Sequence, residues 1–251
     1  FNPMPSPALY KEMPEAYMGM GDTAENVATK YSLSRADQEA FAVESHKKAA
    51  AAQSAGKFVD EIIPIEGPDG TIAEDGCIRG DTTAEGLADL KPAFKADGVV
   101  TAGTSSPLTD GASAVLVCSE EYAKKHGLTP LARIKSVAVD GCLPEIMGIG
   151  PVGASKKALA RAGIKASDLN VVELNEAFSS QAIASISDLG LDIKTVNIDG
   201  GALAIGHPLG ATGARIVGKA AALLKREGGK YALASQCIGG GQGIATILEA
   251  M

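Results

Sequence analysis

The chain has 251 residues, of which 45% are hydrophobic and 21% are charged, and its formal net charge is -7. This length and balance predict one large or two smaller folded domains, and the absence of a dense basic patch excludes a nucleic-acid partner. No apolar run approaches the roughly 20 residues that cross a bilayer, and the four cysteines form no CxxC pair that would suggest disulfides or a zinc site. We therefore expect a cytoplasmic protein without membrane contact or a bound metal.

The first part of the chain is predicted to be an irregular α+β region. Its opening, Phe1 to Pro7, is rich in proline and lacks a starting Met, so we expect the sequence to begin inside a longer protein. A capping box, Ser34-Arg35-Ala36-Asp37, predicts a helix that stops at Gly56. A strand is predicted over 58–65. After a polar stretch with several glycines, a short helix is predicted over 83–90.

The second part of the chain alternates between predicted strands and helices, which indicates a layered α/β unit with a largely parallel sheet. The last two strands are joined by a glycine run and predict an antiparallel hairpin at one side of that sheet. The predicted strands are 115–118, 134–139, 171–174, 195–198, 231–236 and 244–248, and the predicted helices are 152–162, 177–189 and 211–227.

Reactive side chains occur in three segments at strand ends or helix starts. These are Asn175-Glu176-Ala177-Phe178, Gly206-His207-Pro208 and Cys237-Ile238-Gly239-Gly240-Gly241. In an α/β sheet such positions face the same crevice. We therefore expect the histidine, the asparagine and the cysteine to converge on one cleft.

Each of these residues also has a plainer interpretation. His207 lies in the glycine-rich stretch 200–213, where it could cap the following helix as part of a tight turn. Cys237 could be a buried structural cysteine, or a thiol beside backbone amides that bind an anion. Asn175 could cap a helix, and Glu176 could be only a favourable charge near the start of that helix. Within the stretch 200–213 the pattern G-x-G-x-x-G is absent, so this glycine-rich loop is not predicted to bind a dinucleotide.

The other histidines, His46 and His126, are predicted to lie at the surface without a function.

Together the three segments resemble the signatures of the thiolase family, and they occur in the thiolase order. The segment Val100-Thr101-Ala102-Gly103-Thr104-Ser105-Ser106, followed by Asp110-Gly111-Ala112, resembles the CoA-binding loop of the family and the strand after it. The resemblance covers nearly the whole chain. It implies a thiolase-like α/β fold, in which two βαβαβαββ halves pack together and an α+β loop domain inserted in the first half binds CoA.

The resemblance also implies how the chain is divided. Residues 1–108 resemble the CoA-binding loop domain, residues 109–130 the returning end of the N-terminal half, and residues 131–251 the C-terminal half. The main body of the N-terminal half would then be absent, together with the cysteine that accepts the acyl group. We therefore expect the chain by itself to be inactive.

The four cysteines present do not replace that nucleophile. Cys77 lies in a polar turn, Cys118 ends a predicted strand, and Cys142 follows another. Cys237 matches the second, acid/base cysteine of the family.

The activity that the resemblance implies is acyl transfer by a 3-ketoacyl-CoA thiolase or an acetyl-CoA C-acetyltransferase. Such an enzyme cleaves 3-ketoacyl-CoA with CoA to acyl-CoA and acetyl-CoA. His207 would activate the nucleophilic thiol and, with a water held by Asn175, bind one oxyanion, while the Gly239 amide would help bind a second. Cys237 would act as the acid and base of carbon–carbon cleavage. The implied CoA and substrate contacts are Arg79, Ala102, Ser106, Met20, Met147 and Phe178.

Coenzyme A would be a co-substrate, with no permanently bound cofactor, and the family implies a homodimer or homotetramer. Gln242 and Thr104-Ser105-Ser106 resemble degradative enzymes of fatty-acid β-oxidation more than biosynthetic acetoacetyl-CoA thiolases. A ketoacyl synthase is disfavoured, because such enzymes use two histidines where this chain offers His207 with Asn175 and Cys237. The alternative from another class is a non-catalytic module that binds CoA or a partner protein.

Overall fold

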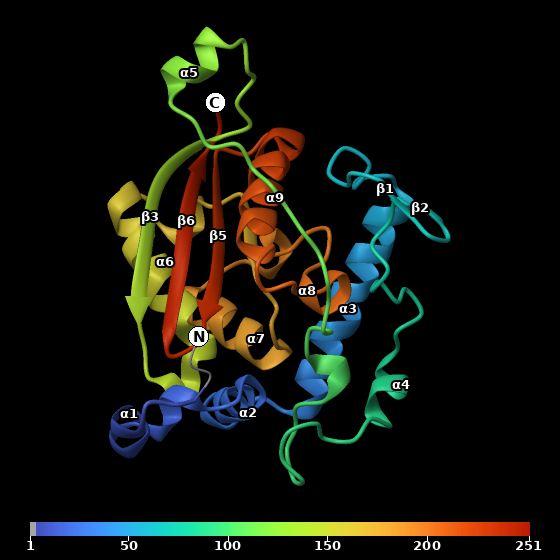
Figure 1. Ribbon diagram of the computed structural model, residues 1–251, viewed down its shortest axis with the longest axis vertical. Helices are drawn as coiled ribbons and strands as arrows, with labels where there is room; N and C mark the ends of the chain where they lie inside the picture. Colours follow the sequence, from blue (N-terminus) through green and yellow to red (C-terminus); the bar gives the residue numbers. More distant parts are fainter. Residues whose placement is uncertain (1–3) are drawn as a thin grey trace.

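The computed structural model describes residues 4–251 and is built on a four-stranded sheet with the order β3-β6-β5-β4. The strands are β3 (Arg133–Gly141), β4 (Val171–Leu174), β5 (Tyr231–Ile238) and β6 (Gln242–Glu249). Neighbouring strands run antiparallel from β3 through β6 to β5, whereas β4 is parallel to β5. Figure 1 shows β3, β6 and β5 side by side.

The prediction of a largely parallel sheet is wrong for the described residues. The terminal hairpin of β5 and β6 is antiparallel, as predicted, but β3 joins it on the β6 side and is antiparallel as well. The predicted strand over 195–198 is reduced to one parallel bridge between Val172 and Val196. A turn of 3-10 helix occupies Ile193–Thr195, so the chain reaches the sheet edge only for this single bridge.

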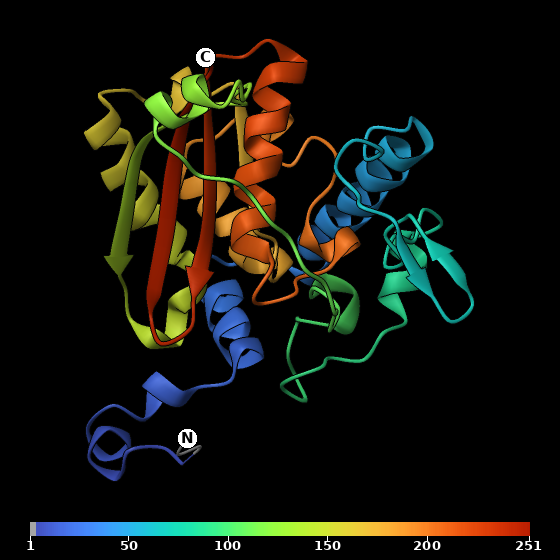
Figure 2. The ribbon, with the colours of Figure 1, turned by 45° about the horizontal axis from the view of Figure 1, so that its top comes forward.

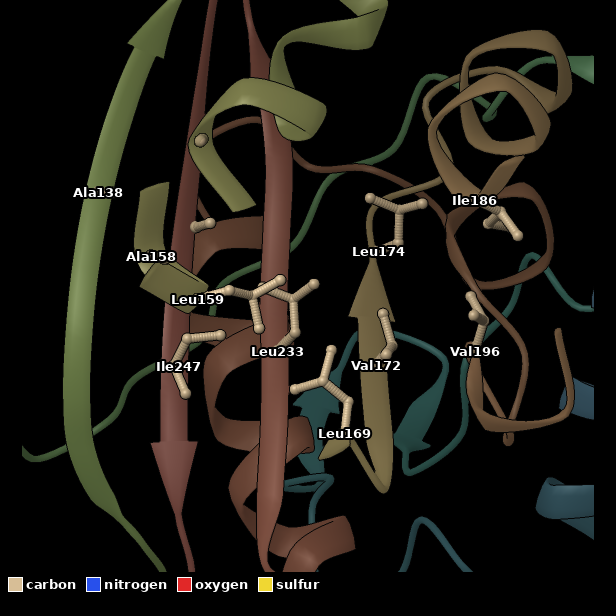
Figure 3. Close-up of a cluster of buried hydrophobic side chains, with 12 residues drawn as sticks. Ala138, Ala158, Leu159, Leu169, Val172, Leu174, Ile186, Val196, Leu233 and Ile247 are labelled. Carbon is tan, nitrogen blue, oxygen red and sulfur yellow. The ribbon is translucent and has the colours of Figure 1, made fainter. Parts of the chain in front are cut away.

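Helices cover both faces of the sheet because successive strand residues point to opposite sides. On one face, α6 (Gly150–Ala162) and α7 (Ser179–Leu189) pack on Val172, Leu174, Leu233 and Ile247, as Figure 3 shows. On the other face, α9 (Thr212–Glu227) packs its Ile216, Ala220, Leu223 and Leu224 on Val171, Ala232, Ala234 and Leu248. Figure 2 shows α9, in orange-red, beside β5 at the front of the molecule.

Residues 4–100 form a mainly helical region beside the sheet (Figure 1). The predicted capping box is confirmed, because Ser34 Oγ accepts from the Asp37 N–H and the Asp37 side chain accepts from the Ser34 N–H at the start of α3. The predicted strand over 58–65 is wrong except for its last residue, since 58–61 form a turn, 62–64 are irregular, and Ile65 only begins a short hairpin. The elements are α1 (Pro7–Glu12), α2 (Met20–Lys30), α3 (Arg35–Ser54), β1 (Ile65–Gly67), β2 (Gly70–Ile72) and α4 (Ala84–Ala88).

An extended segment over 107–119 crosses α9 and leads to α5 (Glu120–Lys125), as both ribbon views show. Ser113 Oγ donates to Ala211 O at 2.6 Å, and Val115 lies against Gly218 of α9. The strand predicted over 115–118 does not form, because the described part of the chain supplies no neighbouring strand for its backbone. Leu116 is 74% exposed, so the segment presents apolar side chains to solvent.

Short helices complete the chain, and among residues 4–251 no helix is both long and apolar enough to cross a membrane. The short helices are η1 (Pro14–Tyr17), η2 (Ala102–Thr104), η3 (Pro144–Ile149), η4 (Ala166–Asp168), η5 (Ile193–Thr195) and α8 (Ala202–Ile205).

Candidate active site

Asn175 and Cys237 lie at the same end of two neighbouring strands. The N–H of Asn175, one residue beyond β4, donates to Ser235 O of β5 at 2.9 Å. Because β4 and β5 are parallel and Leu174 pairs with Ser235, Cys237 lies only two residues further along the adjacent strand. The sheet therefore brings these two predicted site residues together at the carboxyl ends of its parallel strands.

The side chain of Asn175 is buried without a hydrogen-bond partner. The residue is 1% exposed, and neither its amide oxygen nor its amide nitrogen has a partner within residues 4–251. A buried polar group left unpaired costs roughly 1–3 kcal/mol, so this amide is suited to bind a water or a carbonyl group. Helix capping is not its role, because Phe178 occupies the N-cap position of α7.

The backbone around this amide is held by one side chain of α7. Gln181 Oε1 accepts from the N–H groups of Ala177 and Phe178, at 3.1 and 3.3 Å, and its Nε2 donates to Asn175 O at 3.1 Å. These bonds hold the Asn175 backbone while leaving its side-chain amide available.

His207 lies in the loop between α8 and α9 and has a defined tautomer. Its Nδ1 is 2.6 Å from Thr212 Oγ1, and the same hydroxyl donates its hydrogen to Pro208 O at 3.0 Å. Because a hydroxyl carries one hydrogen, Thr212 must accept from His207 Nδ1–H. In the neutral ring Nε2 then carries the lone pair and can act as a base.

The surroundings of His207 favour this neutral form. Burial and the charge of Arg215 both lower the pKa of the imidazole below its usual value. The interpretation of His207 as a helix cap is wrong, since Ala211 is the N-cap of α9 and, within residues 4–251, no side-chain hydrogen bond caps the start of that helix. The first turn of α9 lies beside β5, because a Cβ at Gly213 would be 3.5 Å from Gln236 Nε2, one residue before Cys237.

Cys237 is a protonated thiol at neutral pH. Burial raises the pKa of the Cys237 thiol to about 12. A backbone hydrogen bond lowers this pKa, and the nearby Cys142 raises it. The glycine turn that follows lies against α2, since a Cβ at Gly239 would be 4.0 Å from Met20 Sδ. A thiol in this state can donate a proton to a carbanion but cannot serve as a ready nucleophile.

The structure brings some of the predicted CoA contacts to this site. The Ser106 N–H donates to Ala177 O at 2.9 Å, and Ser105 forms a bridge with Phe178. The segment that contains Ala102 and Ser106 therefore runs beside the Asn175–Phe178 turn. Ala102 is exposed, Met20 is 40% exposed, and Met147 is buried.

Arg79 is exposed, and its position depends on a histidine that sequence analysis placed at the surface. His46 is instead 8% exposed, and its Nδ1 accepts a hydrogen bond from the Arg79 N–H at 3.1 Å. The surface prediction for His46 is therefore wrong, because α3 turns this residue toward the polar loop. His126 is exposed, as predicted.

Comparison with known proteins identifies a family over nearly the whole chain. Residues 5–121 match the thiolase N-terminal domain, and residues 128–250 match the thiolase C-terminal domain. The chain belongs to the thiolase family. The three segments at the site therefore lie in a chain with the thiolase fold.

The similar thiolases include enzymes with two names. The chain is 52% identical over 253 residues to the 3-ketoacyl-CoA thiolase of Cronobacter sakazakii, covering 97% of the chain and 65% of that protein. It is 51% identical over 235 residues to the acetyl-CoA acetyltransferase of Chromobacterium violaceum, covering 92% of the chain and 60% of that protein. The chain thus spans less than two thirds of the length of these thiolases.

Solved thiolase structures show the same fold. The crystal structure of human mitochondrial 3-ketoacyl-CoA thiolase superposes with a TM-score of 0.92 at 47% identity, covering 97% of this chain and 63% of that one. A structure of the human mitochondrial enzyme in complex with CoA gives a TM-score of 0.90 at 46% identity, covering 97% and 62% of the two chains.

Glu176, in the thiolase signature, has a role that sequence analysis missed. The interpretation as a helix-dipole charge is wrong, because α7 begins only at Ser179 and Glu176 is 2% exposed with hydrogen bonds on both oxygens. The signal for this role was the pair Gly200-Gly201. A Cβ at Gly201 would lie 2.1 Å from the Glu176 carboxyl carbon, so only glycine fits against the acid.

Proposed function

We propose that this chain is the CoA-binding and C-terminal part of a thiolase that cleaves 3-ketoacyl-CoA with CoA. The products would be acyl-CoA and acetyl-CoA. The observation that carries this proposal is the His207–Thr212–Pro208 hydrogen-bond chain, which leaves Nε2 of a neutral imidazole as a base in the thiolase signature loop. Residues 1–108 would form the CoA-binding loop domain, 109–130 the returning end of the N-terminal half, and 131–251 the C-terminal half.

In the first half-reaction, His207 Nε2 takes the proton of a nucleophilic thiol supplied by another part of the enzyme. The thiolate attacks the ketone carbon, and the resulting oxyanion is bound by the protonated His207 and by a water on the Asn175 amide. Each such donor typically contributes roughly 3 kcal/mol to transition-state stabilisation. Because the Asn175 amide has no competing partner within residues 4–251, it is free for this water.

Cleavage of the carbon–carbon bond then leaves an acyl group on the nucleophile and the enolate of acetyl-CoA. Cys237 donates its proton to the enolate carbon, which releases acetyl-CoA and leaves a thiolate. That thiolate takes the proton of the incoming CoA thiol, and the CoA sulfur attacks the acyl thioester while the Gly239 amide binds the second oxyanion. The high pKa of the Cys237 thiol suits proton donation to a carbanion.

CoA recognition would involve Arg79 at the adenine and phosphate end and Ala102 with Ser106 along the pantetheine. Met20, Met147 and Phe178 would line the channel to the reacting carbon. Two observations support this arrangement: a Cβ at Gly239 would lie 4.0 Å from Met20 Sδ, and Ser105 forms a bridge with Phe178. The human relative solved with CoA supports CoA as the ligand of this fold.

The biological role we propose is fatty-acid β-oxidation in the cytoplasm, by an enzyme that is a homodimer or a homotetramer. The segments with Gln242 and 104–106 favour this degradative role over biosynthetic acetoacetyl-CoA synthesis, which remains the alternative. The similar proteins carry both kinds of name, so relative rates on long and short 3-ketoacyl-CoA substrates decide between the roles.

The test compares the chain alone with an enzyme in which the upstream thiolase segment is joined to it. After incubation with acetyl-CoA, mass spectrometry should find no acyl group on the chain alone and one acyl group on the joined enzyme. In the joined enzyme, His207→Ala should block acylation, whereas Cys237→Ser should permit acylation but slow turnover. Steady thiolysis by the chain alone, with an acyl group on Cys237, would contradict the proposal.

Separate calorimetry with CoA tests the binding surface. The chain should bind CoA more weakly than the joined enzyme, because the upstream segment would supply one wall of the channel. The double variant Arg79→Ala, Ser106→Ala should weaken this binding further. Unchanged affinity in the double variant would remove both residues from the site.

A further inference from the structure

The carboxyl group of Glu176 joins three elements that are far apart in the sequence. Its Oε2 accepts from Ser45 Oγ at 2.6 Å and from the Leu203 N–H at 3.2 Å, and its Oε1 accepts from Asn197 Nδ2 at 2.7 Å. Ser45 belongs to α3 and Leu203 to α8, while Asn197 lies between η5 and α8. All of these groups are buried, so each bond is shielded from water.

Ser45 connects this acid to the glycine loop. Its hydroxyl donates to Glu176 and accepts from the Gly201 N–H at 3.1 Å. The loop backbone packs directly on α3, because a Cβ at Gly200 would be 2.6 Å from Ala49 Cβ and 2.8 Å from Ser45 O. The path of the loop toward His207 is therefore set by contacts with α3 and Glu176.

Asn197 connects the same acid to the residue before Asn175. Its Oδ1 accepts from the Leu174 N–H at 2.9 Å, and its Nδ2 donates to both Leu174 O and Glu176 Oε1. Asn197 adopts a left-handed backbone with φ of 44°, which a non-glycine residue adopts only when its surroundings demand it. Leu174 and Glu176, the neighbours of Asn175 on either side, are thus both fixed by Asn197.

We propose that Glu176 is a positioning residue that fixes the positions of the Asn175 amide and the His207 loop relative to each other and to α3. It touches no substrate and acts through these two residues, so the inference rests on the proposed thiolase activity. Ser45 extends the same connection to α3, in the region expected to bind CoA. Oxyanion donors displaced by about 1 Å lose on the order of 100-fold in rate, which sets the scale of the expected effect.

Glutamine cannot replace this acid. Asn197 Nδ2 and Leu203 N–H are obligatory donors that face different carboxyl oxygens. In the Glu176→Gln variant, either orientation of the new side-chain amide therefore directs an NH₂ group at one of them. In contrast, Glu173 is 1% exposed on the preceding strand, and its Oε1 has no partner among the described residues, so Glu173→Gln is a matched control.

The experiment uses the joined enzyme and measures kcat, KM for CoA and the rate of acylation at a temperature where circular dichroism shows each variant folded. We expect Glu176→Gln to lower kcat and the acylation rate by roughly 10- to 100-fold, with KM for CoA changed by no more than about twofold. Glu173→Gln should leave both kinetic values close to those of the starting enzyme. Ser45→Ala should lower kcat by a smaller factor, because it removes one of the three bonds to Glu176.

A double variant separates positioning from general loss of stability. If Ser45 acts through Glu176, then Ser45→Ala should have little further effect on kcat in the Glu176→Gln background. If the Glu176→Gln variant does not fold, the test uses Ser45→Ala and Ser45→Thr instead. We then expect kcat to fall in Ser45→Ala and to be retained in Ser45→Thr, which keeps the hydroxyl. Two results would overturn the inference. One is a folded Glu176→Gln enzyme whose kcat is within twofold of that of the unsubstituted joined enzyme. The other is a loss of kcat in Glu173→Gln as large as that in Glu176→Gln. An inactive starting enzyme would instead overturn the proposed thiolase function.

Discussion

The buried acid Glu173 should make the protein lose stability as the pH rises. This residue of β4 is 1% exposed, and its Oε1 has no hydrogen-bond partner within residues 4–251. Burial raises the pKa of its carboxyl group from 4.5 to about 8, despite the opposing charges of Arg215 and Lys219. The folded protein therefore holds the Glu173 proton more tightly than the unfolded chain does.

The sign and size of the effect follow from this difference. Stability from the protonated acid is fully present below pH 4.5, the unfolded value, and is lost as the pH rises toward about 8, the folded value. Each pH unit between these values removes about 1.4 kcal/mol from the free energy of unfolding. Between pH 5 and pH 9 the loss from this one group is then about 4 kcal/mol.

Glu173→Gln removes the titration while keeping nearly the same volume. We expect the free energy of unfolding of this variant, relative to the unmodified protein, to rise by about 4 kcal/mol from pH 5 to pH 9. Urea unfolding followed by circular dichroism at unit pH steps measures it. Glu12→Gln, at an exposed helix end, is the control and should give a curve parallel to the unmodified protein. Parallel curves for Glu173→Gln as well would refute the reasoning.

Three further predictions concern other contacts. Burial alone would raise the pKa of Asp199, but hydrogen bonds from Arg226 and Lys219 hold it at about 2, so its stabilising effect is present above pH 3.8 and lost toward pH 2. The Asp199→Asn variant should therefore have a lower free energy of unfolding than the unmodified protein at pH 7. In urea titrations this difference should shrink toward pH 2. A difference that does not change with pH would contradict the prediction. Gly201→Ala should lower the free energy of unfolding by several kcal/mol, because the new Cβ clashes with Glu176. Gly190→Ala should lower it by only about 1 kcal/mol, because Gly190 has a φ of 60° but open space around it. Equal melting temperatures of these two variants would contradict the close packing. Thr212→Val should lower kcat of the joined enzyme roughly 10- to 100-fold by removing the acceptor for His207 Nδ1–H, and Thr212→Ser should retain activity; equal rates would exclude this hydrogen bond from the mechanism.

Helix limits were largely predictable, because local residues decide them. The predicted ends of α6 and α7 are confirmed, with Gly163 and Gly190 in the left-handed conformation at φ of 69° and 60°. The capping box at Ser34 is likewise formed by neighbours in the sequence. Such signals act over one helical turn and do not depend on the rest of the fold.

Strands were predicted less well, because a strand needs a partner that local sequence does not specify. Val171–Leu174 is a strand as predicted, with β5 beside it, whereas 115–118 has suitable residues but no neighbouring strand among residues 4–251. The direction of β3 was also decided by tertiary pairing, and this made the sheet mixed.

The sequence by itself determined the family, through three signature segments whose order and residue types are specific to thiolases. It also identified Asn175, His207 and Cys237 as the residues to examine. Only the tertiary structure decided the state of these groups: the protonated His207 Nδ1, the Asn175 amide without a partner in residues 4–251, and the raised pKa of the Cys237 thiol. The role of Glu176 was decided in the same way. Its partner Ser45 is 131 positions away in the sequence, and hydrogen bonds of a buried acid depend on distance in space, which spacing along the chain does not encode.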